Sequence, residues 1–221
     1  MKLRYRITYT VDSPFRYAAH LDQARAWERA VRRAGLPLAY SAGFTPHPRI
    51  QIAAALPVGF AGREELLDLW LERPVAPVAA QEALARSVPA GLTVLRVEEA
   101  DPSEPPLPTQ VWAAEYAVSV ETDEPGGEIA RRIEDLLAAE SLPRQRRDRS
   151  YDLRPLVERL WVEEERPGEL TLGMRLAARE GATGRPEEVW DALELTHSLR
   201  YVCRLRLVLA PSLQDEICAS A

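Results

Sequence analysis

Cysteine and histidine are scarce in this 221-residue chain, which limits the metal and redox chemistry open to it. Its two cysteines, Cys203 and Cys218, cannot form a disulfide scaffold, a four-thiolate zinc site or an iron–sulfur cluster. The three histidines are His20, His47 and His197. We therefore predict that the chain binds no metal and no cofactor of its own.

Several motifs of nucleotide and radical chemistry are also missing. The sequence contains no phosphate-binding loop, no GxGxxG, no GxSxG elbow and no CxxxCxxC cluster motif. It has no run of about 18 or more uncharged apolar residues, and its first ten residues contain no apolar signal-peptide core. We expect a cytoplasmic protein without membrane contact that does not hydrolyse nucleotides or perform radical chemistry alone.

Lysine is nearly absent, because 27 of the 28 basic residues are arginine, and the formal net charge is −6. An acidic protein of this kind is not coated for non-specific binding to nucleic acid. The charge is uneven, however. Residues 1–100 carry 13 basic and 10 acidic side chains (+3), whereas residues 101–221 carry 15 and 24 (−9). The first half is mildly basic and the second half is clearly acidic.

The pattern of apolar residues predicts a β-α-β-β-α-β order in residues 1–100. Residues 3–11 alternate between apolar and polar side chains, which predicts a half-buried strand whose open face carries Arg4 and Arg6. The next expected elements are a helix over 20–34 ended by Gly35, strands over 50–56 and 65–72, a helix over 78–88 and a strand over 92–98. This is the ferredoxin-like order, in which two helices cover one face of an antiparallel sheet.

Residues 101–110 contain four prolines and no periodicity, which predicts an extended linker between two domains. The same element order is expected over residues 111–210, with strands at 111–121, within a basic segment at 144–163, at 169–177 and at 201–209, and with helices at 128–140 and from Pro186. Residues 211–221 are expected to form a flexible tail. The predicted fold class is α+β, with two tandem ferredoxin-like domains built on antiparallel sheets.

A stiff loop between Leu36 and Arg49 is the first candidate site. Pro46 and Pro48 flank His47 and fix the backbone on both sides of it, which lowers the entropy cost of holding the imidazole in one place. This suits a binding or catalytic side chain. The alternative is a hairpin-like connection that needs turn residues in any case, in which His47 only caps the turn.

The preceding helix begins with His20 and Asp22, which form a second candidate site. Asp22 lies in the first turn, where the helix dipole alone favours a carboxylate. His20 is equally compatible with a structural histidine packed against the core. Asp22 and His47 together would supply too few ligands for a metal, so we predict none.

Arginine gathers around both candidates, since residues 16–49 carry six basic and two acidic side chains. With Arg4 and Arg6 this predicts a phosphate-binding surface, whereas the alternative is a helix face that is simply solvated. Trp70 is expected to serve domain packing, with a stacking platform for single-stranded nucleic acid as its alternative. The candidate binding residues are His20, Asp22, Arg25, Arg29, Arg32, Arg33, Ser41, Phe44, His47, Arg49, Arg144, Arg146, Arg147 and Arg154; His20 and His47 are also the candidates for catalysis.

Residues 15–71 resemble the radical-SAM-linked proteins of unknown function, a bacterial family that is fused to or encoded beside a B12-binding radical SAM protein. The resemblance rests on HLD at 20–22, the arginine-rich helix, PLAYS at 37–41, GFTPHP at 43–48 and LPVG at 56–59, with DLRPL at 152–156 in the second half. The chain departs from the family at Ala19, where serine is common, at Thr45, where asparagine is common, and at the turn over 61–65. Each change would remove a hydrogen-bonding group that a ligand could use.

This resemblance implies a radical SAM partner that holds the iron–sulfur cluster and the S-adenosylmethionine. Together with the arginine surface, it favours a non-catalytic accessory or substrate-binding module that holds RNA, such as tRNA or rRNA, for that partner. A metal-independent endoribonuclease similar to the CRISPR-associated RNA-processing enzymes is the alternative, with His20 or His47 as general acid or base. A scaffold that docks through the acidic second half is a third reading, and the sequence leaves all three open.

Overall fold

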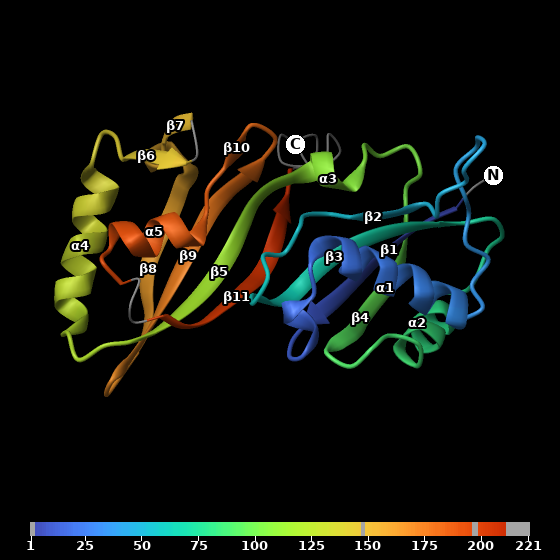
Figure 1. The fold of residues 1–221 in the computed structure, drawn as a ribbon, viewed down its shortest axis with the longest axis horizontal. Coiled ribbons are helices and arrows are strands. Elements are labelled where there is room, and N and C mark those ends of the chain that lie inside the picture. Colours follow the sequence, from blue (N-terminus) through green and yellow to red (C-terminus); the bar gives the residue numbers. More distant parts are fainter. Residues whose placement is uncertain (1–2, 147–148, 196–198, 211–221) are drawn as a thin grey trace, which may run out of the picture. The chain divides into compact units, whose positions relative to one another are not determined.

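The computed structural model describes residues 3–146, 149–195 and 199–210 (Figure 1). Arg147, His197, Cys218 and the tail over 211–221 therefore lie outside the described residues. The fold is α+β, with mostly antiparallel strands and several helices. The chain divides into two compact units, of which unit 1 comprises residues 1–109 and 202–206 and unit 2 comprises 110–201 and 207–221. In the described part of the chain, no helix has the length and apolar character needed to cross a membrane.

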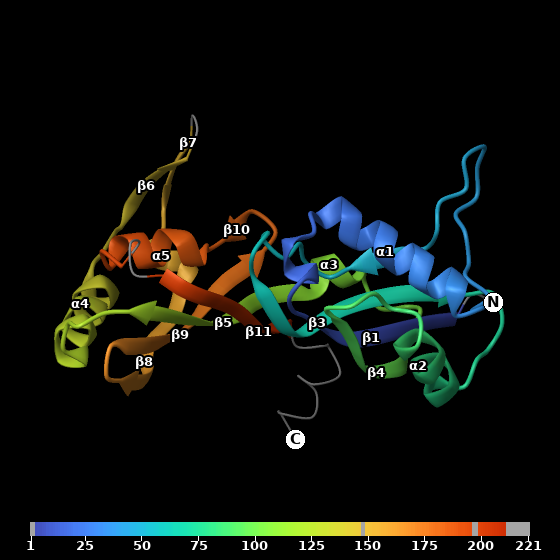
Figure 2. The ribbon, with the colours of Figure 1, turned by 60° about the horizontal axis from the view of Figure 1, so that its bottom comes forward.

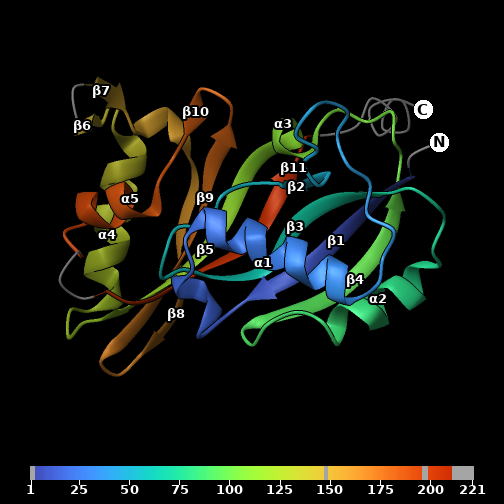
Figure 3. The ribbon, with the colours of Figure 1, turned by 45° about the vertical axis from the view of Figure 1, so that its right-hand side comes forward.

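Unit 1 has the predicted element order. Its elements are β1 (Leu3–Val11), a short helix η1 (Phe15–Tyr17), α1 (His20–Arg33), β2 (Ile50–Ile52), β3 (Ala61–Leu71), α2 (Pro77–Ala85) and β4 (Leu92–Ala100). β1 pairs antiparallel with β3 and β4, and β2 pairs antiparallel with β3, so these strands lie in the order β4-β1-β3-β2. Figures 1 and 3 show α1 lying across β1 and β3.

β1 is buried on both faces, so the prediction of an open basic face was wrong. On one face Tyr9 meets Trp27 of α1 edge to face, with the ring centroids 4.8 Å apart. On the other face Arg4 is only 2% exposed. Its Nε donates a hydrogen bond to Asp68 Oδ2 at 2.6 Å, and Arg6 Nε donates to Asp68 Oδ1 at 2.9 Å. The buried carboxylate of β3 thus satisfies two arginines that alternation alone assigns to solvent.

The strand β11 (Leu199–Leu209) adds residues 202–206 to unit 1, where they pair in parallel with the first half of β3. Arg204 is 2% exposed and faces Glu65, which is 1% exposed. The guanidinium Nε donates to Glu65 Oε1 at 2.8 Å, and its other nitrogens reach two backbone carbonyls of the segment after β2. The last strand of the chain therefore contributes a buried ion pair to unit 1.

The proline-rich segment predicted as an extended linker is fastened to unit 1. The Arg4 side chain donates hydrogen bonds to the backbone carbonyls of Asp101, Glu104 and Pro105 at 3.3, 2.9 and 3.0 Å. The short helix α3 (Leu107–Gln110) follows, with Leu107 fully buried. Arg4 thus anchors both a neighbouring strand and the chain that leaves the sheet.

Unit 2 contains more elements than predicted. They are β5 (Val111–Glu121), α4 (Gly126–Ala138), β6 (Pro143–Arg146), β7 (Arg149–Asp152), η2 (Arg154–Leu156), β8 (Val157–Arg166), β9 (Glu169–Arg179), β10 (Ala182–Thr183) and α5 (Pro186–Ala192). β9 pairs antiparallel with β5, β8 and β10, and β11 follows β5 in the strand order. The predicted strand over 144–163 is divided because Pro155 begins a helical turn, and Asp152 Oδ1 accepts hydrogen bonds from the Leu142 and Arg154 amides.

Candidate functional site

The arginines of α1 form an exposed row on the side of the helix away from the sheet. Ala26, Trp27, Ala30 and Val31 fill the buried side, so the intervening positions must face solvent. The row consists of Arg25, Arg29, Arg32 and Arg33, all of which are exposed. We call these four residues the α1 arginine row. Its members lie three or four residues apart, or adjacent, and so point along one side of the helix.

Two members of the α1 arginine row have carboxylate partners on the helix itself. Arg32 pairs with Glu28 at 2.6 Å, and Arg25 pairs with Asp22 at 3.4 Å. Both pairs are largely exposed to solvent, where such ion pairs are weak and easily exchanged. Arg32 also donates to the Tyr40 hydroxyl at 3.3 Å, and this hydrogen bond, together with Glu28, raises the pKa of Arg32.

The other two members have no acidic partner among the described residues. Arg33 donates a hydrogen bond to the backbone carbonyl of Ser87. Arg29 has no Asp or Glu oxygen within ion-pair distance in the part of the chain that the structure describes. The guanidinium group of Arg29 is therefore available to an external anion.

A pocket of about 280 Å³ lies between α1 and β2. The helix contributes one stripe of side chains to it, and the strand contributes alternate residues that share one face. The lining residues are His20, Leu21, Ala24, Arg25, Glu28, Pro48, Ile50 and Ile52. The floor is apolar, and an imidazole, a guanidinium group and a carboxylate stand at its rim, which is a common composition for a ligand pocket.

His20 is the first residue of α1, and its exposed side chain lines this pocket. The N-cap before it is Ala19, which makes no side-chain hydrogen bond to the helix. The serine that the resembling family carries at this position would satisfy a free amide of the first turn. Helix capping therefore accounts for that serine without any ligand.

The loop over residues 41–47 is a narrow hairpin rather than an irregular connection. A bridge between Tyr40 and Pro48 closes its base. The Ser41 amide donates to the His47 carbonyl at 2.8 Å, and the His47 amide donates to Ser41 Oγ at 2.9 Å. Figure 2 shows the connection between α1 and β2 extending away from the sheet of unit 1. Ser41 is thus a structural residue of the loop, and Phe44 at its tip is fully exposed.

The two candidate histidines are not brought to one pocket. His20 lines the pocket between α1 and β2, whereas the loop contributes Pro48 to that pocket and not His47. The His47 side chain is exposed. The two imidazoles therefore do not line this pocket together, where they could act on one substrate atom. Each histidine stays a candidate for binding.

Arg49 and Trp70 form part of the support beneath the loop. The Arg49 guanidinium lies 4.6 Å from the centre of the Trp70 ring, and the Arg4 guanidinium lies 5.4 Å from it. Trp70 is only 7% exposed. This burial agrees with the expected packing role of Trp70 and not with the alternative of a stacking platform, because two arginines and the sheet already enclose its ring.

The arginines predicted to bind in the second half are less uniform than those of α1. Arg154 was predicted to bind a ligand, but its side chain is bound to the main chain. Its Nε and Nη2 donate to the Leu137 carbonyl at 3.0 and 2.8 Å, and its Nη1 donates to the Val157 carbonyl at 2.9 Å. Three of its N–H donors therefore bind main-chain carbonyls at the end of α4 and the start of β8. Arg144 lies 3.9 Å from a Glu188 oxygen, while Arg146 is exposed. Arg147 lies outside the described residues.

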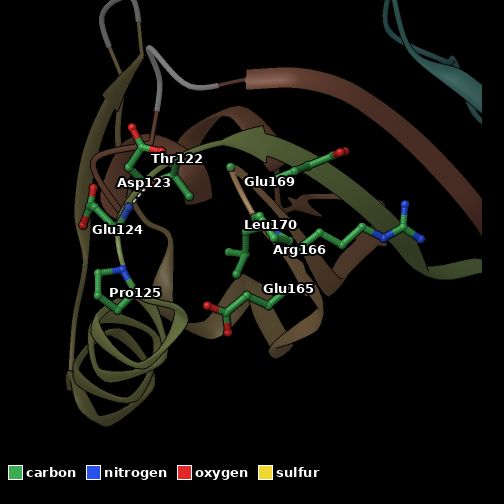
Figure 4. Close-up of a pocket in the computed structure, with 10 residues that line it drawn as sticks. Thr122, Asp123, Glu124, Pro125, Glu165, Arg166, Glu169 and Leu170 are labelled. Atoms are coloured by element: carbon green, nitrogen blue, oxygen red, sulfur yellow. Dashed lines mark hydrogen bonds between the residues drawn. The ribbon is translucent and has the colours of Figure 1, made fainter.

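Sequence reasoning missed a hollow of about 380 Å³ in unit 2, where the turn before α4 meets the turn between β8 and β9. Figure 4 shows Asp123 and Glu124 on one turn and Glu165 on the neighbouring strand, with Arg166 extending away from them. Glu165 Oε1 accepts a hydrogen bond from the Gly126 amide at 2.9 Å and so caps α4. Within the described residues, no three His, Cys, Asp or Glu side chains are placed to hold a metal ion. The negative charge of this hollow does not suit a polyanion.

One protein-family model matches the chain over residues 4–186, and its description is "uncharacterized protein conserved in bacteria (DUF2344)". Comparison with curated proteins gives no match. The matched range covers the α1 arginine row, the loop over 41–47 and most of unit 2.

Solved structures give only distant similarities. An H/ACA ribonucleoprotein bound to a substrate RNA containing 2′-deoxyuridine has 13% identity and a TM-score of 0.47, and a Cbf5-Nop10-Gar1 complex has 12% and 0.48. Each alignment covers 91% of this chain but only 47% and 48% of the other chain. The acetolactate synthase small subunit from Thermotoga maritima has 14% identity and a TM-score of 0.28, with 95% and 96% coverage. Similarities with TM-scores below 0.5 carry no argument about function.

Proposed function

Since the chain belongs to the bacterial family whose model it matches over residues 4–186, we propose that it is a substrate-binding or accessory module that holds RNA for a radical SAM enzyme. The α1 arginine row is the surface that would contact the phosphates. The partner would supply the iron–sulfur cluster and S-adenosylmethionine, and this chain would position the RNA. The proposed partner follows from the resemblance of residues 15–71 to radical-SAM-linked proteins.

The observation that carries the RNA proposal is the state of the α1 arginine row. In a protein of net charge −6, four exposed guanidinium groups lie along one helix, and Arg29 has no carboxylate partner among the described residues. An α-helix rises about 1.5 Å per residue, so Arg25 and Arg32, which lie seven positions apart, are separated by about 10 Å along the helix axis. That length accommodates successive phosphates of a nucleic-acid strand, and guanidinium groups bind phosphate in a forked geometry.

We further propose that both units are ferredoxin-like and that the chain is a tandem of this fold. The strand order β4-β1-β3-β2 in unit 1 and the corresponding order β11-β5-β9-β8 in unit 2 support this proposal. In this description, the hairpin of β6 and β7 is an insertion of unit 2.

Charge reversal at Arg29 tests the RNA proposal. We expect Arg29→Glu to weaken the binding of bacterial tRNA about tenfold at low salt and to lower the slope of log K against log salt by about one. Arg86→Glu is the matched control, because Arg86 is an exposed arginine at the end of α2 and its reversal changes the net charge equally. Fluorescence anisotropy over a salt series measures both quantities. Equal affinity in the two variants and the wild-type protein would contradict the proposal.

Co-expression tests the proposed partner. A tagged copy of the chain should retain a B12-binding radical SAM protein from the same bacterium during purification, and tRNA incubated with the chain in chelator should stay intact. Failure to retain that partner would reject the accessory role. Cleaved tRNA that becomes intact with His47→Ala would instead indicate a nuclease.

A further inference from the structure

Phe44 is the most exposed large apolar side chain of the described residues, at 110% of the reference accessibility. No aromatic or cationic side chain contacts its ring among those residues. Both faces of the ring are therefore free. The whole ring surface is open to another molecule, and covering it would remove apolar area from water.

The loop that carries Phe44 is built to hold its tip away from the protein. The Tyr40–Pro48 bridge and the two hydrogen bonds between Ser41 and His47 form a short stalk. Gly43 has a φ of +133°, a backbone conformation that favours glycine and that turns the chain just before Phe44. The ring is thus presented by a defined turn, at a lower entropy cost than a ring on a free coil.

The sequence around this loop is rich in arginine and carries no carboxylate. No Asp or Glu occurs between Glu28 and Glu64, whereas Arg29, Arg32, Arg33 and Arg49 all lie in that interval. The stalk is joined to the α1 arginine row by the hydrogen bond from Arg32 to the Tyr40 hydroxyl. A ligand that reaches Phe44 therefore meets guanidinium groups on the same unit and meets no carboxylate on the loop itself.

We infer that Phe44 stacks on an unpaired base of the RNA, so that the chain selects single-stranded or looped RNA over a duplex. This inference rests on the proposed function and narrows it. An exposed aromatic ring on the same unit as exposed guanidinium groups suits single-stranded nucleic acid, because stacking covers the ring while the cations bind the phosphates. In duplex RNA the bases are already stacked, so the ring of Phe44 would stay uncovered.

Two substitutions of Phe44 and a control substitution of Val78 separate stacking from simple burial of an apolar group. Phe44→Trp keeps an aromatic ring, Phe44→Leu keeps a large apolar group without a ring, and Val78→Leu changes another exposed apolar residue, on α2. The probe is an RNA hairpin that carries 2-aminopurine either in its unpaired loop or in its stem. Binding affinity and quenching of 2-aminopurine are measured on each protein.

We expect wild-type protein, Phe44→Trp and Val78→Leu to bind the hairpin and to quench the loop label but not the stem label. Phe44→Leu should bind about tenfold more weakly and should not quench the loop label. Wild-type affinity and quenching in Phe44→Leu, together with weak binding by Arg29→Glu, would overturn the stacking inference and leave the proposed function standing. Loss of the radical SAM partner in Phe44→Leu with unchanged RNA binding would also overturn it. Absence of RNA binding by the wild-type protein would overturn both.

Discussion

Arg4 and Arg204 in the sheet of unit 1 are each 2% exposed, whereas Arg25 and Arg29 on α1 lie in solvent. The enclosed arginines have carboxylate partners on β3 and also bind backbone carbonyls. Arg25 has a weak exposed pair, and Arg29 has no carboxylate partner among the described residues. Arginine therefore stabilises the fold in the sheet of unit 1, whereas on α1 it stays available to an external anion.

This difference shows that a count of arginines overestimates the surface open to RNA. Arg4, Arg154 and Arg204 direct their donors at protein atoms, so they have little to offer a phosphate. Removing a partner from an enclosed arginine should reduce stability, whereas changing an exposed one should alter binding alone. Substitutions at enclosed and exposed positions can therefore distinguish arginines that stabilise the fold from arginines that bind a ligand.

The largest effect is expected from Asp68→Ala. Asp68 is fully buried and binds both Arg4 and Arg6, so its removal leaves the enclosed Arg4 guanidinium without a carboxylate among the described residues, whereas Arg6 keeps its ion pair with Glu104. We expect the free energy of unfolding to fall by about 3–5 kcal/mol in urea titrations. Asp22→Ala is the control, because it removes only an exposed partner of Arg25 and a first-turn carboxylate, and it should lower stability by no more than about 1 kcal/mol. An equally small loss of unfolding free energy in Asp68→Ala and Asp22→Ala would contradict the distinction between enclosed and exposed arginines.

A double substitution tests the role of charge in the second buried ion pair, between Glu65 and Arg204. Arg204→Met leaves Glu65 enclosed without its cation and should cost about 3 kcal/mol of unfolding free energy. The double variant Glu65→Leu with Arg204→Met removes both charges, so it should be less destabilised than Arg204→Met alone. Additive losses in thermal or urea unfolding would show that packing, and not charge, dominates this pair.

The smallest effect is expected from Ala19→Ser, at the N-cap of α1, the helix that carries the exposed arginines. A serine at the N-cap of α1 should accept a hydrogen bond from a free amide of the first turn and stabilise the protein by about 1 kcal/mol. Its affinity for tRNA should stay unchanged, since capping needs no ligand. A gain in tRNA affinity without a gain in stability would instead indicate that this position contacts the ligand.

The elements of unit 1 could be predicted because they depend on local periodicity. The strand expected over 3–11 is observed as Leu3–Val11, and the helix expected over 20–34 ends at Arg33. The burial of Arg4 could not be predicted, because its partner Asp68 lies 64 residues further along the chain. A parallel partner for β3 near the end of the chain was likewise beyond any local pattern.

The candidate site shows the same division. The α1 arginine row follows from helical spacing and is found exposed as the spacing requires. The pocket between α1 and β2 needs Ile50 and Ile52 to lie beside Leu21 and Ala24, which only the folded chain reveals. Ser41 and Arg154 lie in the PLAYS and DLRPL segments that carry the family resemblance, whereas their hydrogen bonds with backbone atoms appear only in the folded chain.

The pair of Glu65 and Arg204 also constrains the order of events during synthesis. A ribosome releases Glu65 139 residues before Arg204, and by then almost all of the rest of unit 1 has emerged. Until β11 arrives, the Glu65 carboxylate must stay hydrated, so the first half of β3 cannot reach its final packing. Completion of the earliest part of the polypeptide therefore waits for one of the last strands to be translated.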